Sequence, residues 1–357
     1  MNVRSLDVEV ALRAALAAVV PLAILLSIGR PEWTPYAAFG GMTAIFGRGE
    51  AYRGRLRTVT VATVGLVASV ALGIAAAVAA RGSGGGAVGV GSAASAEASA
   101  ATAITALMLV VVLVGGVLAV NVARLAPPTP LFFVFAVLVC AAVPTPTAEV
   151  GVRLGIAIGS AAFAWALSLS GRLLRRVGSA RFKPLRPPAP VRWSAVRDPA
   201  VWTVIALHVV GALLAGGIAL ASGLGHPYWA VVSVCAVIPP AGAAHSLSRA
   251  WHRVLGTAVG VGVTALILWP DPAAWVLVIV VAVAQFGAEV LIGRHYGAAL
   301  VFVTPLALVV AHLAQPVAVG GLLVDRLVET ALGCAVGILA VLAGRAIDAR
   351  RGARAGR

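Results

Sequence analysis

Apolar residues follow one another along this chain in long blocks and do not alternate with polar ones. A helix that crosses a membrane needs about 20 apolar residues. Runs near that length occur at 8–28, 58–80, 100–120, 149–170, 200–222, 254–269, 273–291 and 323–344. Four shorter runs, at 34–46, 129–143, 229–243 and 298–315, contain or border Gly or Pro. The pattern predicts eight spanning helices and four short segments that either cross the membrane or dip into it.

The composition agrees with a chain dissolved in lipid. Hydrophobic residues make up 61% of the 357 positions and charged residues only 11%, and the mean hydropathy is +1.02. In lipid the backbone must form its hydrogen bonds within the chain, and the lack of strand-like alternation favours helices over a barrel. The expected fold class is therefore an all-α integral membrane protein.

The basic residues indicate how the chain threads the membrane. Lys and Arg in short loops mark the cytoplasmic side. With twelve crossings and a cytoplasmic N-terminus, the outer side keeps only Arg30, Arg81, Arg153 and Arg326. We therefore expect about twelve transmembrane helices in the inner (plasma) membrane, with both termini in the cytoplasm. In this interpretation the net charge of +15 reflects arginines that fix the orientation of the helices in the membrane. Nucleic acid is not an expected partner, because no aromatic residues for stacking on bases accompany the arginines.

An internal repeat divides the chain. A shift of 196 positions places Arg30-Pro31-Glu32-Trp33 on His226-Pro227-Tyr228-Trp229, and Arg53 and Arg57 on Arg249 and Arg253. Six helices per half is an even number, so the two halves would be parallel repeats about an axis along the membrane normal. The predicted parts are a first six-helix half at 1–171, a basic Pro-rich cytoplasmic linker at 172–198, a second half at 199–345 and a basic tail at 346–357.

Corresponding short segments of the two halves are broken by helix-disrupting residues. Gly40, Gly41 and Gly47 interrupt the first, and Pro239, Pro240 and Gly242 the second. Paired, interrupted segments are a sequence-level sign of a transporter binding site. The alternative is that Gly and Pro simply end two short helices.

The motif of the second half resembles a known family. It consists of His226-Pro227-Tyr228-Trp229-Ala230, Arg249 to Arg253, and Leu255-Gly256-Thr257-Ala258-Val259-Gly260. This resembles the fusaric-acid-resistance-like family, the aromatic acid exporters. The first half keeps Pro31, Trp33, Arg53 and Arg57 but has Val59-Thr60 where the second has its Gly-Thr pair. Several members carry a large cytoplasmic domain, where this chain has only its basic linker.

The resemblance implies efflux of aromatic carboxylates across the inner membrane, with more distant kinship to plant organic-anion channels. We expect a transporter of small aromatic or amphipathic carboxylic acids, driven by the membrane potential and, as an open alternative, by proton antiport. Rival interpretations are an organic-anion channel and a non-transporting scaffold for envelope assembly. The linker would bind anionic lipids. The oligomeric state stays open.

Catalytic chemistry is not expected. The sequence contains no HExxH, GxSxG or Walker motif and no cluster of acids around a nucleophile. Cys140, Cys235 and Cys334 lie in apolar runs without CxxC spacing, so they are predicted to be packing residues. We therefore expect no enzyme activity, no metal and no cofactor.

Ionisable residues inside apolar runs are candidates for a substrate pathway, because a charge at the centre of a spanning helix costs about 2.5–3.5 kcal/mol. His208 lies within the run 200–222, and the repeat places Arg13 within one position of it. His208 could bind an anion or carry a proton, or be a hydrogen-bonded packing residue. Arg13 could form a buried anion site or extend to the cytoplasm.

The repeated tryptophans and arginines are further pathway candidates. Trp33 and Trp229 could stack on an aromatic substrate or anchor the chain at the membrane surface. In the RxxxR pairs, Arg53 with Arg57 and Arg249 with Arg253, two guanidinium groups share one helix face. This arrangement suits a carboxylate, and it equally suits a topology anchor.

Acid–base pairs near the outer ends of two helices are candidates for proton coupling, together with His208. Arg326 and Glu329 are three residues apart, and Glu149 and Arg153 are four apart, so each pair lies on one helix face. Each pair is either a local ion pair or a proton-carrying carboxyl tuned by its arginine. Glu289 and His312 are further ionisable residues within apolar runs.

Three glycine pairs have GxxxG spacing, which allows helices to approach closely. They are Gly155 with Gly159, Gly256 with Gly260, and Gly333 with Gly337. We predict that all three are packing contacts.

Overall fold

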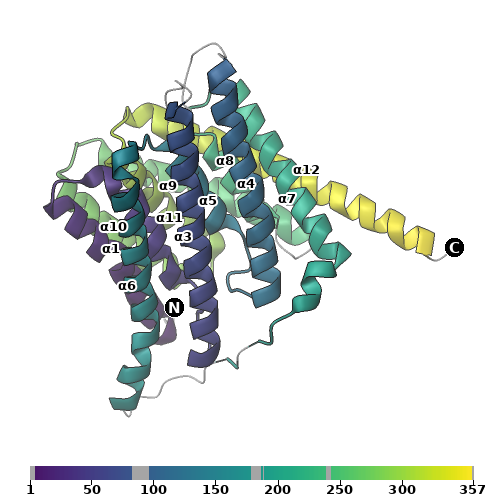
Figure 1. Cartoon of the computed structure of the whole chain (residues 1–357), viewed down its shortest axis with the longest axis horizontal. Coiled ribbons are helices and arrows are strands. Elements are labelled where there is room, and N and C mark those ends of the chain that lie inside the picture. The colour runs from purple at the N-terminus through teal and green to yellow at the C-terminus, as the bar shows by residue number, and fades with distance from the viewer. Residues whose placement is uncertain (1–4, 83–95, 178–185, 188, 239–242, 356–357) are drawn as a thin grey trace.

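The computed structural model describes residues 5–82, 96–177, 186–187, 189–238 and 243–355, which form helices and no strand (Figure 1). The first half contains α1 (Ser5–Ser27), α2 (Thr34–Gly41), α3 (Tyr52–Gly82), α4 (Ala96–Ala123), α5 (Leu131–Ala142) and α6 (Val150–Val177). The second half contains α7 (Pro199–Ala221), α8 (Tyr228–Val237), α9 (Ala243–Leu268), α10 (Ala274–Ile292), α11 (Tyr296–Ala314) and α12 (Val319–Ala355). The predicted all-α class is confirmed.

Nine of the described helices are long and apolar enough to cross a membrane, namely α1, α3, α4, α6, α7, α9, α10, α11 and α12. The run at 298–315, which sequence reasoning placed among the short segments, belongs to the 19-residue α11. The helices α2, α5 and α8 have 8, 12 and 10 residues. At 1.5 Å per residue these helices reach about 12–18 Å, so none of them spans the hydrocarbon core by itself. The chain is a multi-pass membrane protein, but twelve full helical crossings are not confirmed.

Irregular backbone continues the short helix α2 through the protein interior. Next to the start of α2, Trp33 Nε1 donates to Glu149 at the start of α6. Beyond its end, the carbonyl of Ala44 accepts from Arg13 in α1, and the Gly47 amide donates to Ala126 O. Gly47 has a φ of +73°, which glycine adopts at no steric cost. Non-helical backbone at membrane depth requires such protein surroundings. The corresponding Pro239, Pro240 and Gly242 lie outside the described residues.

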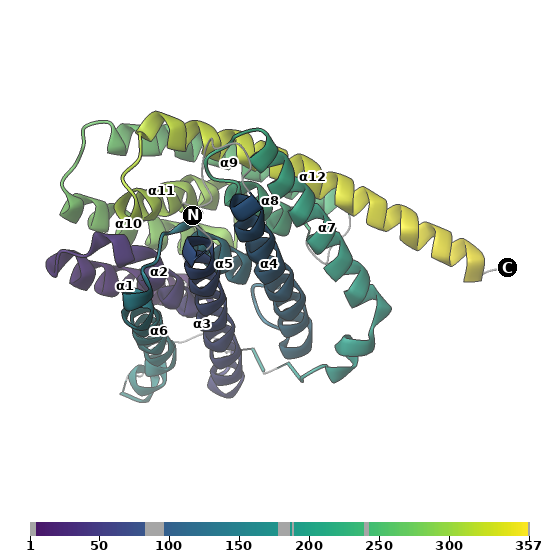
Figure 2. The same cartoon turned by 45° about the horizontal axis from the view of Figure 1, so that its top comes forward.

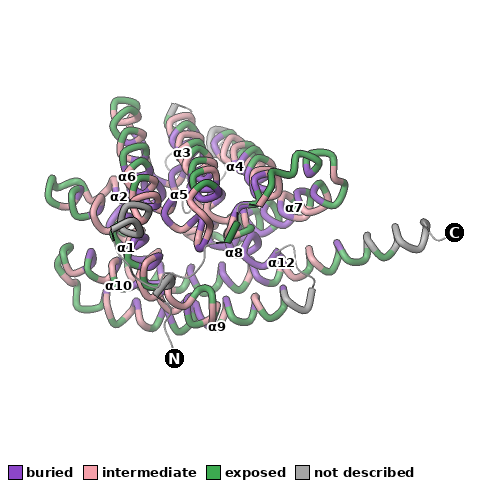
Figure 3. The backbone as a smooth tube through the Cα atoms, turned by 90° about the horizontal axis from the view of Figure 1, so that it is seen from below, coloured by how far each residue is buried: buried purple, intermediate pink, exposed green. Residues whose placement is uncertain are grey.

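The outward faces of the long helices are apolar and carry two levels of exposed tryptophan. Trp251 in α9 is 60% exposed, and Trp269, directly after the end of α9, is 85% exposed. Eighteen residues of helix separate them by about 27 Å, close to the roughly 30 Å thickness of the hydrocarbon core. Tryptophan is enriched at both membrane surfaces, and the spacing of these two residues matches the separation of those surfaces. Seen along the molecule, exposed residues lie on the outer faces of helices and buried ones gather between them (Figure 3).

Helix packing within one half recurs in the other. In the first half α2 packs on α6 and α3 packs on α5, and in the second half α8 packs on α12 and α9 packs on α11. Between the halves, α1 packs on α10 and α4 on α7 (Figure 2). The short helices also cross this boundary, because α2 contacts α11 and α5 contacts α8. The short helices thus lie in the middle of the molecule, enclosed by the long ones.

Two of the three predicted glycine pairs are close-packing contacts. A Cβ on Gly256 or Gly260 of α9 would overlap α11 at Gly297 or Thr304, and a Cβ on Gly333 of α12 would overlap the carbonyl of Ala230 in α8. Gly337 also faces α8, with Val237 at 3.0 Å from an added Cβ. The prediction for Gly155 and Gly159 is wrong, because no described atom lies within 4 Å of a Cβ at either position. Those two glycines face away from the neighbouring helices.

We predict that Gly256→Ala destabilises the protein, because the backbone of α9 and α11 would have to separate. Overpacking of this kind costs about 1–3 kcal/mol, seen as a lower midpoint of thermal unfolding in detergent. Gly262→Ala on the same helix is the matched control, since a Cβ there meets nothing within 4 Å in the described structure. Equal midpoints for the two variants would contradict this packing.

Candidate functional site

A cavity of about 1020 Å³ lies in the middle of the protein, where the two halves meet. The first half contributes residues from α1, α2, α4 and α5, including Phe39 and Phe135. The second half contributes residues from α7 to α12, including Trp229 and Leu322. Most of the lining side chains are apolar. The cavity therefore presents a low-dielectric wall in which a few polar groups act strongly.

The charged groups that line this cavity are predominantly positive. They comprise five arginines, Arg48, Arg186, Arg249, Arg253 and Arg326, against two acids, Glu289 and Asp325. Charges of one sign in a cleft with apolar walls concentrate counter-ions of the opposite sign. The site therefore favours an anion.

The second RxxxR pair is held at the cavity by α8 and α11. Arg253 Nε donates to Ser233 Oγ over 3.1 Å, and its Nη1 donates to the Tyr296 hydroxyl over 3.3 Å. Arg249 Nε donates to the Ala236 carbonyl over 3.2 Å, and its guanidinium carbon lies 4.4 Å from the centroid of the Tyr296 ring. Spacing of four residues places both side chains on one face of α9. This predicted pair is thus brought together at the cavity.

Arg326 lines the same cavity and is 1% exposed. Its guanidinium carbon lies 3.9 Å from the centroid of the Trp229 ring, a cation–π contact. Its Nε and Nη1 have no hydrogen-bond acceptor among the described residues. Burying a guanidinium without hydrogen-bond acceptors costs free energy. An anion that supplies an acceptor would therefore bind favourably at Arg326.

The interpretation of Arg326 and Glu329 as a local ion pair is not supported, since no ion pair joins them within the described ranges. Glu329 instead faces α8, where its Oε1 accepts from the His226 amide over 3.0 Å. Asp325 accepts from the Gly225 amide over 3.2 Å and lies 2.8 Å from His226 Nδ1. Both carboxylates thus hold the start of α8, where orphan helical N–H groups attract negative charge.

Aromatic rings form part of the cavity wall near Arg326. The Phe135 centroid lies 5.0 Å from that of Trp229 and 6.4 Å from that of Tyr228. The Tyr228 and Trp229 centroids are 4.9 Å apart. These distances are typical of interacting aromatic rings. Phe135 comes from α5 and the other two from α8, so the cluster also joins the halves.

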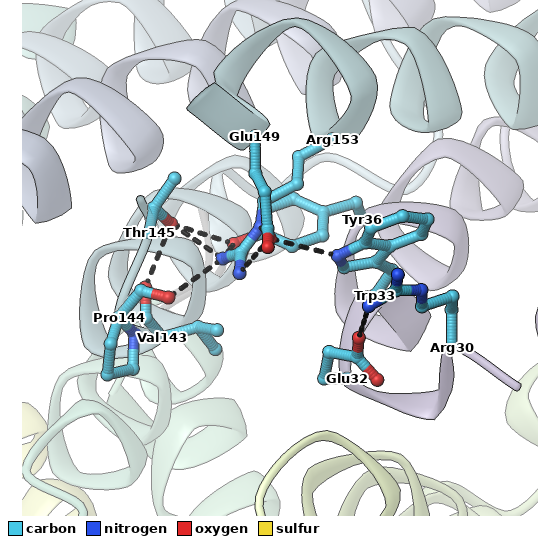
Figure 4. A network of polar contacts seen from close by, with 9 residues as sticks. All are labelled: Arg30, Glu32, Trp33, Tyr36, Val143, Pro144, Thr145, Glu149 and Arg153. Atoms are coloured by element: carbon cyan, nitrogen blue, oxygen red, sulfur yellow. Dashed lines mark hydrogen bonds and ion pairs between the residues drawn. The ribbon is translucent and has the colours of Figure 1, made fainter. Parts of the chain in front are cut away.

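Glu149 and Arg153 form the predicted i,i+4 ion pair, in a network of polar contacts within the first half (Figure 4). Arg153 Nε and Nη2 donate to Glu149 Oε2 over 2.9 and 2.7 Å. Its Nη1 donates to the Tyr36 hydroxyl, Thr145 Oγ and the Pro144 carbonyl over 2.8–2.9 Å. Trp33 Nε1 donates to Glu149 Oε2 over 3.2 Å. This network ties α2, the α5–α6 connection and α6 together, and Trp33, Glu149 and Arg153 do not line the central cavity.

The remaining pathway candidates also lie away from the cavity lining. Arg13 is buried, and its Nη2 donates to Ala44 O over 3.0 Å. Arg53 is exposed, and Arg57 Nη2 donates to Ala189 O in the linker over 2.5 Å. The first RxxxR pair therefore does not repeat the role of the second, because its side chains face solvent and the linker.

His208, the candidate within α7, is buried and does not line the central cavity. The side chain is 2% exposed, and its Nδ1 lies 2.9 Å from the carbonyl of Val204 one turn earlier. It lines a separate cavity of about 320 Å³ between α4 and α7, beside Asn121, Arg124 and Arg192. The lining of the central cavity by α7 begins at Ala212, one turn further along the helix, so His208 lies outside that lining.

Several residues at the cavity were missed as site residues by sequence reasoning. Arg48 Nη1 donates to the Glu289 carbonyl over 2.7 Å and lies 3.5 Å from Glu289 Oε2, which joins the two halves. Tyr296 positions both Arg249 and Arg253. No local pattern marks Arg48 as a site residue, because its contact with Glu289 joins positions 241 residues apart. The described residues contain no group of three His, Cys, Asp or Glu that could hold a metal.

Comparison with known proteins supports the resemblance seen in the sequence. The model of a family described as fusaric acid resistance protein-like matches residues 212–340, which include Arg249, Arg253 and Arg326. The uncharacterized membrane protein YvaC of Bacillus subtilis (strain 168) is 33% identical over 125 residues. That segment is 35% of this chain and 20% of YvaC, so the match spans about a fifth of the relative's length. No solved structure matches the chain.

We predict that Arg153→Met and Arg326→Met differ in stability. Removing Arg153 takes the donor from the Tyr36 hydroxyl, Thr145 Oγ and the Pro144 carbonyl, and a buried polar group left unsatisfied costs about 1–3 kcal/mol. Replacing Arg326, whose Nε and Nη1 lack acceptors among the described residues, should be neutral or stabilising. Thermal unfolding in detergent measures both, and a larger loss in Arg326→Met would contradict this account.

Proposed function

We propose, from the match to the fusaric acid resistance protein-like family, that this chain is an inner-membrane efflux transporter of small aromatic or amphipathic carboxylic acids. The central cavity, with its apolar walls, aromatic cluster and excess of arginine, is the observation that carries this proposal. Its volume of about 1020 Å³ lies at the upper end of the range for small-molecule sites, roughly 300–1,000 Å³. An aromatic carboxylate would place its ring against Phe135, Tyr228 and Trp229 and its charge toward the arginines.

The helix packing supports two parallel repeats around this cavity. Exchange of the halves turns the α1–α10 contact into the α7–α4 contact and the α2–α11 contact into the α8–α5 contact, and all four occur. We propose that α2, α5 and α8 complete their crossings with irregular backbone, which gives twelve crossings and cytoplasmic termini. A site between parallel repeats is where alternating access would expose a substrate to either side.

The membrane potential would supply the energy for export. A carboxylic acid with a pKa near 4 is an anion in neutral cytoplasm. Moving one negative charge out of an inside-negative cell releases about 2.3 kcal/mol per 100 mV. Proton antiport would need a titratable group at the cavity, where Glu289 lines the wall and Glu329 adjoins Arg326. His208 lies in the other cavity and is poorly placed for that role.

We further propose that the linker meets anionic lipids at the cytoplasmic surface. Arg192 and Arg197 lie beside Trp193, which is 74% exposed, and Trp202, which is 46% exposed. Exposed tryptophan with arginine is typical of a segment at the lipid headgroups. Transport in this proposal involves no covalent chemistry and no nucleic acid.

We predict that Arg253→Gln slows the release of 4-hydroxybenzoate from protein-containing liposomes under an inside-negative potential. Loss of a charge-assisted contact of about 1.5–3 kcal/mol corresponds to a reduction of roughly tenfold or more at limiting substrate. Arg53→Gln is the matched control, because Arg53 belongs to the equivalent RxxxR pair but is exposed. The control should release at the unaltered rate.

The amount of folded protein in the liposomes is measured for each variant and for the unaltered protein. Equal amounts show that slower release does not come from loss of folding. Release that is unchanged in Arg253→Gln, or equally slow in both variants, would count against a cavity-bound anion. Release no faster than from empty liposomes would remove the efflux proposal for this substrate.

A further inference from the structure

The two halves each place a tryptophan of the short segment next to a buried arginine of the last helix. In the first half three N–H groups, Trp33 Nε1 and Arg153 Nε and Nη2, all donate to one carboxylate oxygen, Glu149 Oε2. Arg153 is 4% exposed. The protein thus contains within itself a complete carboxylate-binding site, in which the carboxylate is supplied by its own chain (Figure 4).

The second half holds the same donors without the carboxylate. Trp229 and Arg326 are each 1% exposed and in contact, with the guanidinium over the indole ring. Trp229 Nε1 and Arg326 Nε and Nη1 are all buried and lack an acceptor in the described part of the chain. Both residues line the central cavity. Three unused donors thus sit together at the wall of a cavity that favours anions.

The reason for the missing carboxylate is visible in the sequence. The alignment that places Gly171-Arg172 on Gly344-Arg345 also places Arg153 on Arg326, and it brings Glu149 onto Leu322. Leu322, one turn before Arg326, is 1% exposed and lines the cavity. A leucine there leaves open the place that the glutamate fills in the first half.

We propose that the carboxylate of the transported acid binds to Trp229 and Arg326 in the place that Glu149 takes against Trp33 and Arg153. The inference rests on the proposed function, since it names the group that recognises the substrate. The nearby acids do not fill this place, because Glu329 and Asp325 are bound at the start of α8. Arg253, whose charge acts on Arg326, adds to the positive potential. The neighbouring Phe135 and Tyr228 receive the apolar part of the acid.

The test uses one substitution that supplies the missing carboxylate. Leu322→Glu places a carboxylate four residues before Arg326, as Glu149 stands before Arg153, and should occupy the site from within. Calorimetry on the purified full-length protein with benzoate as the probe should show binding weakened at least tenfold, because loss of charge-assisted hydrogen bonds has effects of that size. The midpoint of thermal unfolding should rise in the same variant, because Arg326 gains a partner.

Leu322→Gln is the matched control, with the same size and no charge. Its loss of benzoate binding should be much smaller than that of Leu322→Glu, and its thermal midpoint should not rise. Trp229→Phe keeps an aromatic ring but removes the N–H, and should weaken the binding of benzoate more than that of benzyl alcohol, an uncharged analogue.

Full benzoate binding in Leu322→Glu overturns the inference, and so does equal loss in Leu322→Glu and Leu322→Gln. Absence of saturable benzoate binding to the unaltered protein overturns it as well. Binding and flux are measured separately. Benzoate binding that Leu322→Glu abolishes, in a protein that releases nothing from liposomes, would support the carboxylate site and reject the efflux proposal.

Discussion

A guanidinium group stays charged under all physiological conditions and loses its hydration when it is buried, so the surrounding protein must supply acceptors for its N–H groups. This constraint determines the middle of the structure. In the first half it is met within the chain, because Arg153 has Glu149, Tyr36, Thr145 and Pro144 as acceptors. In the second half Arg326 contacts only the face of Trp229 through the described interactions. In the first half the guanidinium therefore has acceptors from the chain itself. In the second half two N–H groups of Arg326 have no acceptor among the described residues.

The short helices make this arrangement possible. The helices α2, α5 and α8 are too short to cross the bilayer by themselves, and side chains from all three line the cavity. Close approach of α12 to α8 at Gly333 brings Arg326 over Trp229, and close approach of α9 to α11 at Gly256 brings Arg253 to Tyr296. Larger residues at these glycines would separate the groups that form the site.

The sequence was sufficient to predict the features that depend on local pattern. Hydrophobic run length predicts the long helices, and the repeat identifies Trp229, Arg249 and Arg253, which do line the cavity. The same repeat predicts equal roles for Arg53 and Arg57, but symmetry of sequence does not fix which way a side chain faces at a helix end. An apolar run likewise does not show which neighbouring helix His208 faces. The Arg48–Glu289 contact depends on the docking of the two halves, which no local pattern encodes.

In the proposed function a carboxylate crosses the membrane as an anion through the cavity between the halves. Recording the current across a bilayer that contains the purified protein, with a gradient of 4-hydroxybenzoate and equal pH on both sides, tests this claim directly. The account predicts a current carried by negative charge down the benzoate gradient, with a reversal potential that shifts as the gradient changes and with little current in Arg326→Gln. A current independent of the benzoate gradient, or an undiminished current in that variant, would contradict it.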